Sequence, residues 1–166
     1  MASGYRGKGF SAHVGVGLRY LELDVEDEKN DDLTVDVGAL VVLGNMLRIA
    51  AVGHNLIESE FTEAPRRLGL GTSILYKGLL ISFDSVIDFE SLGHTQAQYN
   101  MGAEYALAGR VPFRVGYQID KITDAQYITG GFGFVSRTAA ADFGFRQNLN
   151  NEKDNIFSFN LRFFIP

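Results

Sequence analysis

The chain has 166 residues, of which 46% are hydrophobic and 21% charged, and its formal net charge is -5. The acidic balance argues against nucleic acid as a partner, and the absence of cysteine excludes disulfides, thiol catalysis and cysteine-based metal sites. No run of about 18 apolar residues occurs, so no transmembrane helix is predicted. The opening residues M-A-S-G-Y-R-G-K-G-F contain no apolar stretch of the kind found in secretory signals. The numbering therefore fits either a cytoplasmic chain or a mature chain or fragment.

Alternation of apolar and polar residues, which is typical of β-strands, runs from about residue 10 to the end of the chain. In the first predicted strand Phe10, Val14 and Tyr20 share one face, while His13 and Arg19 share the other. Residues 1–9 are interpreted as an N-terminal tail and residues 10–166 as a single β-barrel domain. The predicted strands, about ten in number, cover residues 10–20, 33–43, 46–57, 68–76, 79–89, 96–107, 111–120, 128–134, 141–146 and 155–165.

The predicted connections alternate between long and short along the chain. The long ones are polar and lie near residues 25–32, 57–66, 90–95, 120–125 and 148–155. The short ones lie near residues 44–46, 77–78, 108–110 and 137–139. In an up-and-down meander all the long loops then project from one end, as in outer-membrane barrels with short periplasmic turns. An even number of strands would place both termini on the side of the short turns.

The two faces of the predicted strands differ in charge. One face is almost free of charge over whole strand lengths, and in water it would form a larger apolar patch than soluble monomers expose. The other face carries glycines and balanced charges, which suits a lumen. The sequence thus predicts an all-β fold, an up-and-down antiparallel transmembrane β-barrel of about ten strands. Its predicted lumen-lining charged residues are Arg19, Asp36, Arg48, Arg67, Asp84, Asp88, Glu104, Arg114, Asp120, Asp142, Arg146 and Arg162.

The residues that could carry chemistry favour a protein that is not an enzyme. The three histidines have no ligand-like spacing, so no metal site is predicted. The glycine clusters lie inside strands with no helix after them, which argues against a phosphate loop. Asp84 and Asp88 could form an acid–base pair, but pairing with lumen arginines such as Arg67 or Arg114 is favoured. No catalytic residue and no cofactor is predicted.

Several strand patterns resemble the FadL/PorV-like superfamily of outer-membrane β-barrels. They are F-S-A-H-V-G-V-G-L-R-Y followed by L-T-V-D-V-G-A-L, and L-R-I-A-A-V-G-H-N-L followed by A-P-R-R-L-G-L-G-T-S-I-L-Y. The resemblance implies a place in the bacterial outer membrane, about fourteen strands, and roles from hydrophobic-substrate uptake to secretion accessory. About ten strands would correspond to the C-terminal portion of such a barrel. A truncated chain, a natural smaller barrel, and one chain of a barrel completed by another polypeptide or by N-terminal strands all fit.

The last strand resembles the C-terminal signal by which outer-membrane barrels are recognised for assembly. The residues predicted to form this signal are Phe159, Leu161, Phe163 and Phe164. The expected partners are accordingly the lipid bilayer and the barrel-assembly machinery. The expected function is structural, porin-like transport or secretion accessory, with a narrow charged lumen. The alternative is a soluble lipocalin-like β-barrel that binds a lipophilic ligand with its apolar faces turned inward.

Overall fold

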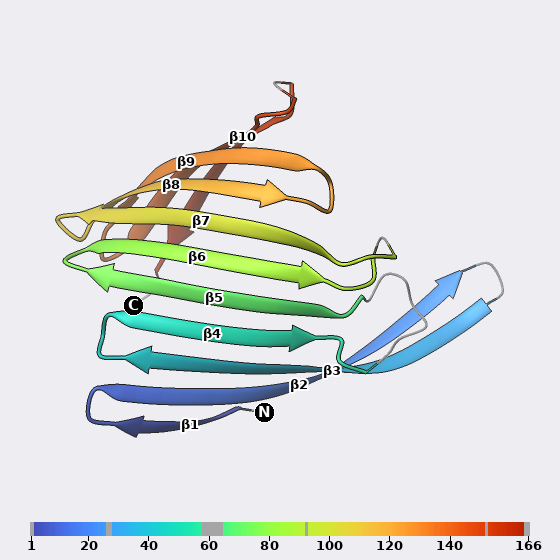
Figure 1. The fold of residues 1–166 in the computed structure, drawn as a ribbon. Coiled ribbons are helices and arrows are strands. Elements are labelled where there is room, and N and C mark those ends of the chain that lie inside the picture. The colour runs from blue at the N-terminus through green and yellow to red at the C-terminus, as the bar shows by residue number, and fades with distance from the viewer. Residues whose placement is uncertain (1, 26–27, 58–64, 92, 152, 165–166) are drawn as a thin grey trace. The chain divides into compact units, whose positions relative to one another are not determined.

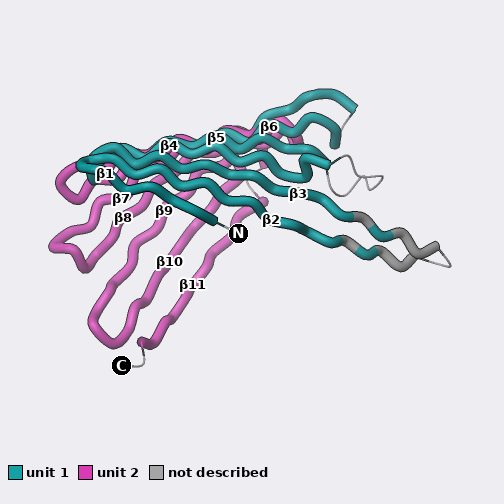
Figure 2. Tube along the Cα trace, turned by 90° about the horizontal axis from the view of Figure 1, so that it is seen from below, with its two compact units in different colours: residues 1–72, 84–97 teal, residues 73–83, 98–166 magenta. Residues whose placement is uncertain are grey.

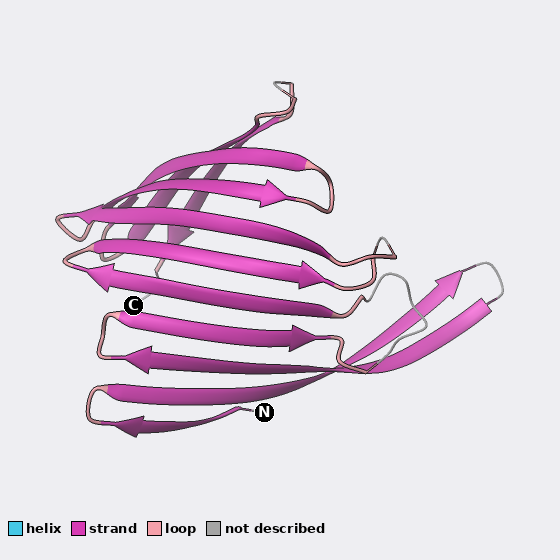
Figure 3. Ribbon diagram, in the orientation of Figure 1, coloured by secondary structure: helices cyan, strands magenta, loops and turns pink. Residues whose placement is uncertain are grey.

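The computed structural model describes residues 2–25, 28–57, 65–91, 93–151 and 153–164. Within these ranges every regular element is a β-strand, as Figures 1 and 3 show, and no helix capable of crossing a membrane occurs there. The strands are β1 (Ala2–Gly7), β2 (Phe10–Val25), β3 (Glu28–Leu43), β4 (Leu47–His54), β5 (Arg67–Tyr76), β6 (Leu79–Asp88), β7 (Gln96–Leu107), β8 (Val111–Asp120), β9 (Ala125–Val135), β10 (Ala139–Asn148) and β11 (Asn155–Phe163).

The strands form an antiparallel up-and-down sheet in the order β1 to β11, which confirms the all-β meander predicted from the sequence. Two parts of the prediction need correction. The described strands number eleven, so the start of β1 lies on the side of the long loops and only the end of β11 lies on the side of the short turns. The sheet is also open, because β1 and β11 are edge strands that do not pair with each other.

The chain divides into two compact units, which Figure 2 distinguishes by colour. The first unit contains residues 1–72 and 84–97, and the second contains residues 73–83 and 98–166.

In the first unit the ladder between β2 and β3 is the longest feature. It runs from the pair Phe10 and Leu43 to the pair Val25 and Glu28. The sequence predicted a loop at residues 25–32, but most of that segment belongs to β3. The ladder is formed by backbone N–H and C=O groups, so polar side chains do not prevent two antiparallel strands from pairing. Residues 2–7, assigned to a tail from the sequence, form β1 and pair along β2.

In the second unit the register of β7 to β11 decides which side chains meet. Glu104 lies directly opposite Arg114, and Arg114 lies directly opposite Gly131 on β9. Asp142 on β10 lies between Gly133 and Asn160. Residues directly opposite each other in an antiparallel ladder project from the same face. The charged side chains of these strands therefore share one face of the sheet.

Three predicted short turns, at residues 44–46, 77–78 and 108–110, are confirmed, whereas the fourth lies at residues 136–138 and the turn between β1 and β2 was not predicted. The turn between β5 and β6 shows why such turns can be predicted. Only Lys77 and Gly78 separate Tyr76 from Leu79, and both have positive φ values of 48° and 84°. Two consecutive left-handed residues produce the type of two-residue hairpin whose twist matches that of the flanking strands. Glycine at the second position adopts this conformation without steric cost.

The described residues contain very little buried apolar surface. The only buried hydrophobic residues among them are Ala125 and Ala140, which are 6% and 2% exposed. A soluble domain of about 150 residues normally removes roughly 70% of its chain's surface from water. Many large apolar side chains of the described residues are instead exposed, for example Leu18 at 73% and Phe163 at 76%.

Candidate functional site

The apolar face of the second unit is bare. Val115 on β8 is 65% exposed and Phe159 on β11 is 68% exposed. Rings on β9, β10 and β11 contact one another, with centroid separations of 5.5 Å, 6.3 Å and 5.2 Å along the series Phe132, Phe143, Phe157 and Phe145. A shallow apolar hollow of about 390 Å³, lined in part by Met101 and Ile128, lies on β6 to β9. This face offers apolar contact and almost no hydrogen-bonding groups.

The polar face of the same unit carries four ion-paired side chains. Arg114 donates from Nε to Glu104 Oε2 over 2.6 Å and from Nη1 to Asp142 Oδ1 over 2.8 Å. Arg162 donates from Nη2 to Asp142 Oδ2 over 2.8 Å. Glu104, Arg114, Asp142 and Arg162 are called here the arginine–carboxylate network. It connects β7, β8, β10 and β11.

Two glycines allow this network to span β9. Gly131 and Gly133 occupy the positions on β9 that lie between Arg114 and Asp142, so no side chain separates the guanidinium from the carboxylate. A Cβ atom on Gly133 would lie 2.5 Å from Asp142 Oδ1, closer than carbon and oxygen can approach without movement. The glycines that the sequence placed on the polar face thus create the space for a long-range ion pair.

An open cleft of about 680 Å³ adjoins the network on β8 to β11. Three arginines line it, namely Arg114, Arg146 and Arg162, together with the carboxylate of Asp142 and the neutral side chains of Thr129, Ser158 and Asn160. Cζ of Arg146 lies 4.4 Å from the centre of the Tyr127 ring. Stacking on an aromatic face holds a guanidinium in place without neutralising its charge.

The first unit has a smaller polar cluster around Asp36. Arg19 Nη2 lies 2.8 Å from Asp36 Oδ2, and His54 Nδ1 lies 3.2 Å from the same oxygen. The backbone N–H of Asn55 donates to Asp36 Oδ1 over 3.0 Å, and Asn55 Nδ2 donates to the carbonyl of Pro65 over 3.0 Å. The cluster therefore fixes the end of β4 to β3 and to the residues that precede β5.

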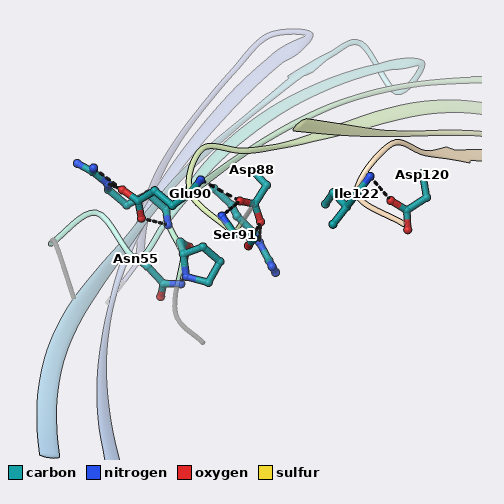
Figure 4. Close-up of polar contacts among 9 residues, drawn as sticks. Asn55, Asp88, Glu90, Ser91, Asp120 and Ile122 are labelled. Atoms are coloured by element: carbon teal, nitrogen blue, oxygen red, sulfur yellow. Dashed lines mark hydrogen bonds and ion pairs between the residues drawn. The ribbon is translucent and has the colours of Figure 1, made fainter. Parts of the chain in front are cut away.

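At the end of β6, Asp88 binds both an arginine and a turn, as Figure 4 shows. It accepts hydrogen bonds from Arg67 Nε over 2.8 Å, from Ser91 Oγ over 2.6 Å, and from the backbone N–H groups of Ser91 and Glu90. Its side chain is 1% exposed. The expected pairing of Asp88 with Arg67 is confirmed, and no acid–base pair with Asp84 is needed to explain this carboxylate.

Glu90, in the loop after β6, binds Arg66, which lies immediately before β5. The backbone N–H of Arg66 donates to Glu90 Oε2 over 3.0 Å, and the guanidinium pairs with Oε1. These hydrogen bonds from Arg66 stabilise the carboxylate and hold the pKa of Glu90 below its ordinary value.

The remaining charged residues assigned to a lumen are not ion-paired in the same way. Asp120 accepts a hydrogen bond from the backbone N–H of Ile122 (Figure 4). It also accepts hydrogen bonds from the backbone N–H and the hydroxyl of Thr123, so it closes a turn. Among the residues that the structure describes, Arg48 and Asp84 form no ion pair, so the expected pairing of Asp84 with a lumen arginine is wrong. The predicted set therefore separates into the network members, the ion pairs Arg19–Asp36 and Arg67–Asp88, the turn former Asp120, and single charges.

The residues predicted to form an assembly signal lie at the end of the chain. Phe159, Leu161 and Phe163 are exposed on β11. Phe164 follows β11 and donates its backbone N–H to the carbonyl of Thr138 over 2.9 Å. The three β11 residues form an apolar edge row, while Phe164 extends the pairing to the turn before β10.

Sequence reasoning missed two contributors to these clusters. Tyr127 supports Arg146, and Asn55 connects Asp36 to Pro65. The left-handed backbone of Asn55, with φ of 54°, is the conformation that asparagine tolerates best among side-chain-bearing residues. No pattern in the sequence predicts the stacking of Arg146 on Tyr127, because the two residues meet only through the ladder between β9 and β10.

The described residues contain no group of His, Asp and Glu side chains arranged to hold a metal ion. Comparisons of the chain with protein-family models, with curated proteins and with solved structures found no match.

Proposed function

We propose that this chain is an outer-membrane β-barrel protein, or the larger part of one, whose polar face lines a narrow charged lumen and whose apolar face contacts lipid. The exposed apolar face carries the proposal. It supports a structural, transport or secretion-accessory role, in which the sheet provides a wall or a passage and performs no catalysis. The polar clusters described above then act as the interior lining.

The energetics of the apolar face support a lipid environment. Full burial of one Leu or Phe side chain contributes about 1.5–3 kcal/mol relative to exposure in water. Phe157, Phe159 and Phe163 on β11 alone are each more than half exposed. Leaving such side chains in water along every strand would remove the main driving force for folding. Acyl chains cover them and require no hydrogen bonds in return.

The unpaired edge strands β1 and β11 support a second part of the proposal, that additional strands close the barrel. In a meander of eleven strands β1 and β11 run in the same direction, so pairing them directly would create a parallel ladder. Closure by antiparallel pairing takes an odd number of additional strands from another segment or another chain. Unpaired edge groups in a bilayer cost several kcal/mol each, so pairing of the two edges with additional strands would stabilise the sheet.

Extraction and gel mobility test this proposal. The protein is expected to stay with the outer-membrane fraction, to need detergent after extraction, and to migrate differently on a gel before and after heating. A chain that is monomeric and folded in detergent-free buffer would refute the proposal. If it also bound a lipophilic fluorophore, the soluble lipocalin-like alternative would replace it.

A further inference from the structure

The open cleft on β8 to β11 has an excess of positive charge. Arg114, Arg146 and Arg162 line it together with one carboxylate, Asp142, while Glu104 lies outside the lining and binds Arg114. The excess is notable because the whole chain has a formal charge of -5. Positive charge is thus concentrated in one cleft of an acidic protein.

The three arginines differ in the number of carboxylates that they bind. Arg114 is bound to two carboxylates and Arg162 to one. Arg146 stacks on Tyr127 and, among the residues that the structure describes, has no carboxylate partner. A guanidinium keeps its charge at any physiological pH and presents N–H donors in a planar fork that suits two oxygen atoms of one anion. Arg146 therefore has donors available for a ligand in the cleft.

We propose that this cleft binds a small oxyanion of the carboxylate or phosphate class, with Arg146 as its principal contact and Arg162 as a second. Ser158, Asn160 and Thr129 supply neutral donors on the same wall. Asp142 sets the affinity, because it neutralises part of the charge of the two arginines that it binds. The inference names a ligand class for the proposed lumen and so rests on the proposed function.

The geometry favours anions over cations and small ligands over large ones. The one carboxylate that lines the cleft, Asp142, already binds two guanidinium groups, so a cation would meet three arginines and no unpaired carboxylate. Arginine-lined constrictions are the usual arrangement for anion and phosphate selectivity in membrane pores. The volume of about 680 Å³ accommodates a hydrated oxyanion or a small organic acid.

Titration of the detergent-solubilised chain, labelled with ¹⁵N at arginine, tests the inference. Inorganic phosphate, acetate and chloride are added separately at constant ionic strength, and the Nε–Hε resonances are followed. Phosphate or acetate is expected to shift the Arg146 resonance saturably. Saturable shifts with both phosphate and acetate would indicate a general oxyanion site, and a saturable shift with only one of them would show whether the site prefers phosphates or carboxylates. Arg146→Gln should weaken the affinity about tenfold or more, as expected for loss of a charge-assisted hydrogen bond.

Matched variants distinguish a specific loss of binding from unfolding and from a general change of charge. Asp142→Asn should strengthen binding, a change that a damaged fold would not produce. Arg110→Gln and Asp124→Asn alter the same charges in exposed turns of the same unit and should leave affinity unchanged. A response that never saturates, or equal losses for Arg146→Gln and Arg110→Gln, would overturn the inference. A protein that needs detergent but binds no oxyanion would overturn the inference alone.

Discussion

A lysine placed on either face of β7 gives a direct measure of which face meets lipid. Met101 and Asn100 are neighbours near the centre of the twelve-residue strand Gln96–Leu107, and they project from opposite faces. Met101 is 45% exposed on the apolar face, while Asn100 lies on the polar face, where its Oδ1 accepts a hydrogen bond from Gln98. Met101→Lys and Asn100→Lys add the same charge at nearly the same depth.

The expected magnitudes follow from the length of the strand. Twelve residues at about 3.3 Å each extend roughly 40 Å, which covers an apolar band of about 25 Å at the tilt usual in membrane barrels. Met101 then lies near the middle of the bilayer, where a lysine on the lipid face costs about 2–4 kcal/mol. That cost lowers the folding equilibrium constant by roughly 30-fold to 1,000-fold. Asn100→Lys loses one hydrogen bond in an aqueous interior and should cost about 1 kcal/mol or less.

The measurement is reversible folding into phospholipid vesicles across a urea series, with folded and unfolded protein separated by gel mobility. Wild type and the two variants are compared under one lipid composition. If Met101 faces water, replacing an exposed methionine should change stability by less than about 0.5 kcal/mol. Equal small effects of the two substitutions, or a larger loss for Asn100→Lys, would refute the assignment of the faces.

Three further predictions concern the polar clusters. Asp88→Asn should destabilise the protein in urea by about 2 kcal/mol and more than Arg67→Gln does, because the carboxylate also holds the turn after β6; equal losses would contradict this. Hydrogen bonds from Arg66 lower the pKa of Glu90, so they should stabilise the folded protein fully above the ordinary glutamate pKa of about 4.3. This stabilisation of the folded protein should disappear as the pH falls through the lower pKa that Glu90 has in the folded state. The unfolding midpoints of wild type and Glu90→Gln should then converge in acid, and a constant difference would exclude that cause. Gly133→Ala should move Asp142 Oδ1 away from Arg114, because the added methyl group occupies its place, while the bond from Arg162 to Asp142 Oδ2 persists. A structure of the variant in which both bonds are intact would contradict this prediction.

The division of the strands into an apolar and a charged face could be predicted from the sequence because it is a local property. A strand repeats every two residues, so parity alone assigns Val115 and Arg114 to opposite faces. The tight turn at Lys77 and Gly78 was predictable for the same reason, since its chemistry lies in the two residues themselves. The pairing of Asp88 with Arg67 required only that β5 and β6 form a hairpin.

Partners beyond one hairpin depended on register, which no local pattern encodes. Arg114 reaches Asp142 because β9 places two glycines between them, and a shift of β9 by one residue would fill that space. The pairing of β1 with β2 was also missed, because glycines and charges interrupt alternation in residues 2–7. The amino-acid sequence by itself thus determined the period, the faces and the tight turns. The tertiary structure decided the strand number, the open edges and the long-range ion pairs, since these depend on how separate ladders align.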